Sequence, residues 1–128
     1  ALRALTSERI ICVFGCGGNR DKGKRPLMGQ VATRCADEVW VTSDNPRNEE
    51  PQHIIEDILA GTRGVAKDGL VRVEPDRARA IFAAIGGAHH GDVVLIAGKG
   101  HETYQEIAGE RLPFSDISVA KKALEAWT

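Results

Sequence analysis

Two uninterrupted apolar runs, each followed by a glycine, constrain the fold of this 128-residue chain more than any other feature. Residues 10–14 precede Gly15, and residues 93–97 precede Gly98. Continuous apolar strands are typical of parallel sheets, because helices cover both faces of such sheets. The two runs therefore predict an α/β fold in which residues 10–14 form a central strand and residues 93–97 lie beside it.

The rest of the chain alternates between helical and strand patterns. Apolar residues at helical spacing predict helices that begin near Pro26, Pro51, Asp76 and Ser115. In the first of these helices one apolar stripe is formed by Leu27, Met28, Val31, Ala32 and Cys35. Further strands are expected at residues 38–42 and 70–73, and residues 103–112 read as a hairpin. This order predicts a Rossmann-like, doubly wound, mostly parallel sheet with helices on both faces and an antiparallel edge hairpin.

Composition excludes several classes of protein. The 17 Lys and Arg residues nearly balance the 18 Asp and Glu residues, so the chain lacks the broad positive field that non-specific nucleic-acid binding needs. No apolar stretch approaches the roughly 20 residues that span a bilayer, and residues 1–5 are too short for a secretory segment. The three cysteines lack C-x-x-C spacing, which fits free thiols in a reducing compartment. We therefore expect a single cytoplasmic domain that binds neither nucleic acid nor membrane.

Three polar loops follow the predicted strands, at residues 15–22, 44–47 and 98–102. In a parallel sheet all three would emerge at the carboxyl ends of the strands, which is where α/β folds bind their ligands. Their charged residues predict a small-molecule site at this edge.

Residues 44–47, Asp-Asn-Pro-Arg, are the most constrained of these loops. Pro46 fixes its own φ and keeps Asn45 out of the helical region, so the turn is stiff. A stiff turn of this kind can also be no more than the lead-in to a helix. The mixture of charges favours binding, because Arg47 can hold a carboxylate with two parallel hydrogen bonds while Asp44 accepts from an ammonium group. The ligand that this combination predicts is a zwitterion.

The loop at residues 98–102 adds a second carboxylate. Gly98 allows close backbone approach, and Glu102 could hold another ammonium group, although a glycine-rich turn before an edge strand has the same pattern. His101 has no assigned role. With Arg20 and Arg47, the two acids would match a ligand that carries two carboxylates and two amines.

The loop at residues 15–22 matches neither G-x-G-x-x-G nor G-x-x-x-x-G-K-[ST], so it is not a nucleotide-phosphate loop of either type. Two interpretations of this loop remain. It places Arg20, Asp21 and Lys22 at the carboxyl end of the first strand as part of a site, or it is a solvent-exposed basic turn without a binding role. Cys16 reads as a small filler residue rather than a nucleophile. No catalytic residue and no metal ligand are assigned.

The three loops resemble, in order and spacing, motifs of the carboxy-terminal domain of the Mur ligases. The matching segments are residues 13–26, 44–47 and 98–102, and the similarity covers essentially the whole chain. Within the family they look most like the branch that adds meso-diaminopimelate. The resemblance implies that the residues that bind this amino acid are Arg20, Asp44, Asn45, Pro46, Arg47, Gly98 and Glu102. It further implies that Asp21 and Lys22 approach ATP when the domain closes as a lid, and that Arg47 selects diaminopimelate over lysine.

The resemblance also implies a reaction in peptidoglycan precursor synthesis in the bacterial cytoplasm. With ATP and Mg²⁺, the terminal carboxylate of UDP-N-acetylmuramoyl-L-alanyl-D-glutamate would become an acyl phosphate, which the amine of meso-diaminopimelate attacks to form an amide. Residues 1–128 correspond to the amino-acid-binding lid, without the UDP-binding and ATPase domains of such ligases, and we expect them to be inactive alone. The alternative that the sequence leaves open is a stand-alone amino-acid-binding or regulatory module without catalysis.

Overall fold

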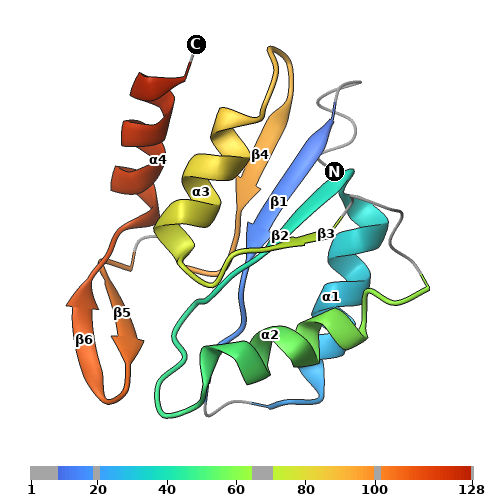
Figure 1. Ribbon diagram of the computed structural model, residues 1–128, viewed down its shortest axis with the longest axis vertical. Helices are drawn as coiled ribbons and strands as arrows, with labels where there is room; N and C mark the ends of the chain where they lie inside the picture. The colour runs from blue at the N-terminus through green and yellow to red at the C-terminus, as the bar shows by residue number, and fades with distance from the viewer. Residues whose placement is uncertain (1–8, 19–20, 65–70, 100–101, 128) are drawn as a thin grey trace.

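A four-stranded parallel sheet forms the centre of the molecule. The computed structural model describes residues 9–18, 21–64, 71–99 and 102–127 (Figure 1). Within them the strand order is β3-β2-β1-β4, and each neighbouring pair is parallel. The strands are β1 (Ile10–Phe14), β2 (Glu38–Val41), β3 (Val71–Val73) and β4 (Val93–Ile96). The predicted parallel α/β sheet is confirmed, with β1 in the interior and β4 beside it.

Helices cover both faces of this sheet, as predicted (Figure 1). They are α1 (Lys24–Cys35), α2 (Pro51–Ala60), α3 (Arg77–Gly86) and α4 (Asp116–Ala126). Successive side chains of β1 point to opposite faces of the sheet and therefore pack against different helices. Ile10, Cys12 and Phe14 belong to the core beneath α2, whereas Ile11 and Val13 pack with α3 and α4. None of the described helices is long and apolar enough to cross a bilayer.

Side chains cap the first turns of two helices, near the starts that the sequence predicts. The side chain of Asp76 accepts a hydrogen bond from the N–H of Arg79 at 3.1 Å, at the start of α3. The hydroxyl of Ser115 accepts from the N–H of Ser118 at 3.3 Å, at the start of α4. Both satisfy backbone donors that the first turn of a helix leaves unpaired.

The orientation of α1 differs from what its apolar stripe suggests. The residues that α1 buries are Arg25, Gly29 and Thr33, while Leu27 and Val31 are each 59% exposed. The reason is the close approach of α2, because a Cβ at Gly29 would overlap the carbonyl oxygen of Ile58. Helix α1 therefore packs on α2 through its narrow polar side and leaves its apolar stripe open.

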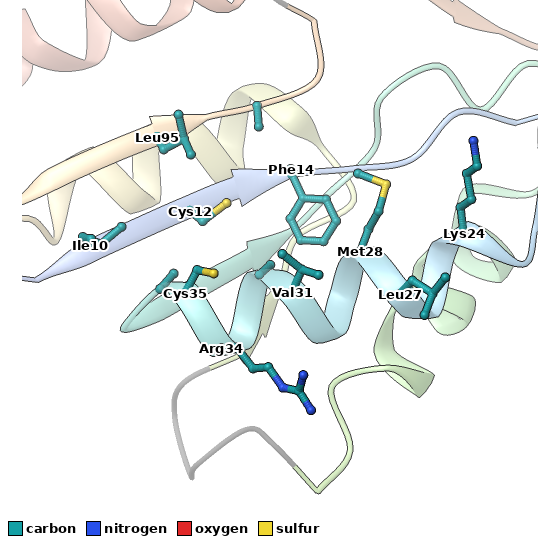
Figure 2. Close-up of a pocket in the computed structure, with 13 residues that line it drawn as sticks. Ile10, Cys12, Phe14, Lys24, Leu27, Met28, Val31, Arg34, Cys35 and Leu95 are labelled. Carbon is teal, nitrogen blue, oxygen red and sulfur yellow. The ribbon is translucent and has the colours of Figure 1, made fainter. Parts of the chain in front are cut away.

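The open stripe lines an apolar groove between α1 and the sheet (Figure 2). The groove has a volume of about 750 Å³ and runs from Ile10 past Cys12 to Phe14, with Met28 of α1 opposite. Leu95 of β4 lies on the same side and is 40% exposed. Strand β4 is thus only partly buried, although its apolar sequence predicts burial on both faces.

Strands β5 (Tyr104–Ile107) and β6 (Glu110–Pro113) form the predicted antiparallel hairpin. Its two-residue turn has positive φ at Ala108 (51°) and at Gly109 (81°), as expected for a type I′ connection. In the described residues the hairpin is a separate two-stranded sheet, and an isolated β-bridge between Arg47 and Ile107 connects it to the turn after β2.

Candidate functional site

Strand β5 binds the backbone of the turn that follows β2. The N–H of Arg47 donates to the carbonyl of Glu106 at 2.9 Å, and the N–H of Ala108 donates to the carbonyl of Arg47 at 2.7 Å. The side-chain amide of Gln105 donates to the carbonyl of Asp44 at 2.7 Å. The turn is therefore held along its length by a strand about 60 residues later in the chain.

Arg47 adopts a backbone conformation that non-glycine residues rarely adopt. Its φ is +53°, in the left-handed region, which costs an arginine about 1–2 kcal/mol. Its Nε donates to Oε2 of Glu106 at 2.9 Å, and its Nη1 donates to the carbonyl of Gly18 at 3.0 Å. Backbone and guanidinium are both fixed, so the positive charge has a defined position.

The glycine-rich loop after β1 packs directly against the same turn. The N–H of Gly18 donates to the carbonyl of Asn45 at 2.7 Å. A Cβ at Gly18 would overlap the carbonyl of Pro46, and a Cβ at Gly15 would overlap that of Thr42. Glycine is needed here because two backbones touch, as the sequence suggested only for Gly98.

Lys99 connects the second and third motifs through a buried ammonium group. Its Nζ lies 2.8 Å from Oδ1 of Asn45 and 3.0 Å from the carbonyl of Tyr104, and it donates to both. It also lies 3.1 Å from Oδ1 of Asp44 and 3.6 Å from Oε1 of Glu102. The contact to Asp44 is an ion pair rather than an aligned hydrogen bond, because Oδ1 of Asp44 has no hydrogen-bond donor among the described residues.

The charges at this edge form two subsites of opposite sign. The acidic subsite comprises Asp44, Glu102 and Lys99, whose two carboxylates and one ammonium group leave a net charge of −1. The basic subsite comprises Arg47, Arg111 and Glu106, whose two guanidinium groups and one carboxylate leave +1. A small cavity of about 250 Å³ is lined by the basic subsite. Side by side, the two subsites can hold one ammonium and one carboxylate group of the same ligand.

The structure brings most of the predicted site residues together. Asp44, Asn45 and Glu102 share Lys99 as a partner. Gly98, with φ of +112°, faces Asp44: a Cβ there would lie 4.0 Å from Oδ2 of that residue. Arg20 and His101 lie outside the described residues.

Asp21 and Lys22, the predicted ATP-proximal residues, are exposed at the start of α1. Oδ1 of Asp21 accepts a hydrogen bond from the N–H of Gly23 at 2.9 Å. Nζ of Lys22 lies 3.9 Å from Oε1 of Glu49, and the Lys22 side chain is 71% exposed. An exposed ammonium group on a flexible stem can reach a phosphate, so these residues are compatible with a nucleotide brought from outside.

Sequence reasoning missed Lys99, Gln105 and Glu106. Lys99 stood inside a motif but between two glycines, with no local partner that would mark it as buried. Glu106 and Gln105 contact residues 59 and 61 positions earlier. No short-range pattern signals such contacts.

Cys16 is not a nucleophile in this fold. Burial raises the pKa of its thiol to about 11, although the charge of Arg25 acts in the opposite direction. Its Sγ lies 3.6 Å from the sulfur of Met28, beside the apolar groove. The thiol is therefore protonated near neutral pH and acts as a small apolar side chain.

The fold and the site define a class of protein: a Rossmann-like α/β domain with an acidic and a basic cluster of side chains at the carboxyl ends of its strands. Residues 1–100 match the family model described as Mur ligase, glutamate ligase domain. The chain belongs to the Mur ligase family and is its carboxy-terminal domain.

Individual relatives agree with this assignment. The chain is 66% identical over 127 residues to the UDP-N-acetylmuramoyl-L-alanyl-D-glutamate--2,6-diaminopimelate ligase of Acidovorax sp. (strain JS42), covering 97% of this chain and 25% of that protein. It is 57% identical over 119 residues to the ligase of the same name from Chromobacterium violaceum, covering 93% and 23%. A solved structure of a ligase of that name superposes with a TM-score of 0.86 at 45% identity, covering 94% of this chain and 24% of that one. The chain thus spans about a quarter of the length of these relatives.

Proposed function

We propose that this chain is the amino-acid-binding lid of an ATP-dependent ligase that adds meso-diaminopimelate to UDP-N-acetylmuramoyl-L-alanyl-D-glutamate. The names of the relatives supply the reaction, and about three quarters of their length lies outside this chain. That remainder would contain the UDP-binding and ATPase domains. The substrates place the reaction in the bacterial cytoplasm.

The observation that carries the proposal is the pair of oppositely charged subsites. An amino acid presents one ammonium and one carboxylate on the same carbon, which matches a net charge of −1 beside one of +1. Arg47 would receive the carboxylate through Nη2, because among the described residues its Nε is bound to Glu106 and its Nη1 to the carbonyl of Gly18. Lysine lacks a carboxylate at its side-chain end, so a site that binds this end selects diaminopimelate.

The residues of this chain would bind and orient the amino acid while the rest of the polypeptide performs the phosphoryl chemistry. ATP with Mg²⁺ supplies the phosphoryl group that activates the acceptor carboxylate. Of the chain's own residues, we expect Lys22 and Asp21 to approach the nucleotide, and their exposure just before α1 supports this expectation. The main contribution of this domain would then be proximity, which holds the amine next to the activated carbon.

The test is substrate-dependent ADP release by the longest natural polypeptide that contains this chain. With the UDP-dipeptide present, we expect kcat/KM for meso-diaminopimelate to exceed that for L-lysine by at least about 100-fold. Residues 1–128 alone should release no ADP. Selective binding of meso-diaminopimelate without any ADP release from the long polypeptide would instead identify an amino-acid-binding module, and equal rates with L-lysine would contradict the proposed specificity.

A further inference from the structure

We propose that Lys99 is a positioning residue of the amino-acid site: its buried ammonium group fixes Asp44 and Asn45 and leaves the acidic subsite with charge for one ligand ammonium group. The inference deepens the proposed function and rests on it. Lys99 itself does not reach the ligand, because its side chain is fully buried among its own partners.

Because Lys99 is buried, its ammonium group depends on its four contacts for stability. The side chain is 0% exposed, and lysine is almost never buried to this extent without charged or polar partners. Those partners come from three separate segments: the turn after β2, the loop after β4, and β5. One ammonium group therefore joins the segments that carry the predicted ligand contacts.

Lys99 sets the orientation of the Asn45 amide. Oδ1 of Asn45 accepts from Nζ of Lys99 at 2.8 Å and from the N–H of Glu106 at 2.9 Å. A flipped amide would place its own N–H groups against these two donors. The NH₂ group of Asn45 therefore points away from Lys99, and the ammonium group and the N–H of Glu106 together hold this orientation.

Lys99 also sets the charge that a ligand meets. Among the described residues it is the only cation paired with Asp44, and it lies within 3.6 Å of Glu102 as well. Without it the subsite would hold two carboxylates and a net charge of −2. Like charges at close range repel one another, so the arrangement of these two carboxylates depends on Lys99.

The experiment compares Lys99→Gln and Lys99→Met with Lys122→Gln in the long polypeptide described above. Lys122 is an exposed residue of α4 and provides the matched control. We expect both Lys99 variants to raise KM for meso-diaminopimelate at least about tenfold and to change KM for ATP by less than about twofold. The control should leave both constants unchanged.

A double-mutant cycle separates positioning from general structural support. If Lys99 acts through the Asp44 carboxylate, Lys99→Gln should raise KM less than about threefold in an Asp44→Asn background, because the Asp44 charge that Lys99 holds is already absent. Additive effects of the two substitutions would overturn the inference. If Lys99→Met does not fold, Lys99→Gln carries the test, since its amide still donates to one neighbouring oxygen.

Different results would contradict the proposed function and the assignment of Lys99. A wild-type polypeptide that ignores meso-diaminopimelate contradicts the function, and hydrogen exchange then tests Lys99 without any substrate. The Glu106 N–H donates to the amide that Lys99 orients. In Lys99→Gln it should exchange at least about tenfold faster than in wild type, with no such change in Lys122→Gln. An unchanged exchange rate, or a wild-type KM in an active and folded Lys99→Gln enzyme, overturns the assignment of Lys99.

Discussion

The guanidinium group of Arg77 and the carboxylate of Asp116 form a two-point ion pair in the interior of the molecule. Nε of Arg77 lies 2.7 Å from Oδ1 of Asp116, and Nη2 lies 2.8 Å from Oδ2. The remaining donors of Arg77 bind the carbonyls of Ser43 and Ala97, just beyond the ends of β2 and β4. One buried pair thus joins the first turns of α3 and α4 to the sheet edge from which the site loops leave.

Breaking this pair from either side should destabilise the fold. Arg77→Met or Asp116→Leu leaves one buried charge without its partner, and we expect each to lower the free energy of unfolding by about 3–5 kcal/mol. Urea denaturation measures the loss. The double variant Arg77→Met/Asp116→Leu should lose clearly less than the sum of the two, and single losses below about 0.5 kcal/mol would show that the pair is not structurally important.

Substitutions at Arg47 should separate the role of its side chain from that of its backbone. Arg47→Ala removes a charged contact to the ligand and should weaken selection of meso-diaminopimelate by about 2–3 kcal/mol. Arg47→Gly should lose the same selectivity, yet be more stable than Arg47→Ala by about 1 kcal/mol, because glycine adopts a φ of +53° without strain.

The measurements are kcat/KM ratios for meso-diaminopimelate against L-lysine in the long polypeptide and thermal unfolding of both variants. Arg47→Lys should fail as well, since an ammonium group cannot reproduce the planar fork that binds Glu106 and the carbonyl of Gly18 and still presents Nη2 to a ligand. Retained selectivity in Arg47→Lys would show that only the charge at this position matters.

A methyl group at Gly18 should separate the glycine-rich loop from the Asp44–Arg47 turn. The Cβ would overlap the carbonyl of Pro46, so we expect Gly18→Ala to cost about 1–3 kcal/mol of stability and to weaken amino-acid binding. Gly86→Ala, in α3 with open space around its Cβ, is the control and should be neutral or slightly stabilising. Equal stability of the two variants would contradict the close approach of the loops.

Asp92 should contribute stability that depends on pH. The backbone N–H of His89, at 2.9 Å, is the main cause of its lowered pKa, followed by the hydrogen bonds from Arg9. Because the folded pKa lies below the ordinary value of 3.8, this contribution is fully present above that value and is lost as the pH falls through the folded pKa. Asp92→Asn should lower the free energy of unfolding at pH 7 by about 1–3 kcal/mol. The difference from wild type should shrink below about pH 4, and a difference that is constant from pH 7 to that range would contradict this reasoning.

The three thiols should differ sharply in reactivity. Cys35 is exposed, whereas Cys12 and Cys16 are buried and their thiol pKa values are raised to about 11, chiefly by burial. At pH 8 only about one in a thousand of each buried thiol is a thiolate, so an aromatic disulfide reagent should titrate one thiol rapidly in the native chain. Cys35→Ser should abolish this rapid reaction, and all three thiols of the wild type should react in denaturant. Rapid labelling of Cys16 in the native chain would contradict its burial.

Short sequence patterns predicted the parts of the fold that depend on residues close together in the chain, namely strands and helix starts. The apolar runs located β1 and β4, and the caps Asp76 and Ser115 marked the starts of two helices. The site loops were found because parallel strands deliver their carboxyl ends to one edge, whatever the details of packing.

Features that depend on contacts between distant segments were not predictable in this way. The apolar stripe of α1 suggested one buried face, but α1 turns Gly29 and Thr33 inward because α2 approaches too closely for larger residues. Glu106, 59 residues after Arg47, became part of the site only through the docking of β5 on the turn. A single sequence contains no local signal for either arrangement.

We expect the hairpin of β5 and β6, which carries part of the site, to be less stable than the rest of the domain. A two-stranded sheet is at best marginally stable by itself, and this one is held mainly by the turn that it binds. We therefore expect the hairpin to open before the four-stranded sheet and its two cores unfold. An amino acid that bridges the two subsites would add contacts to both the hairpin and the turn, so its binding would stabilise the hairpin more than the four-stranded sheet.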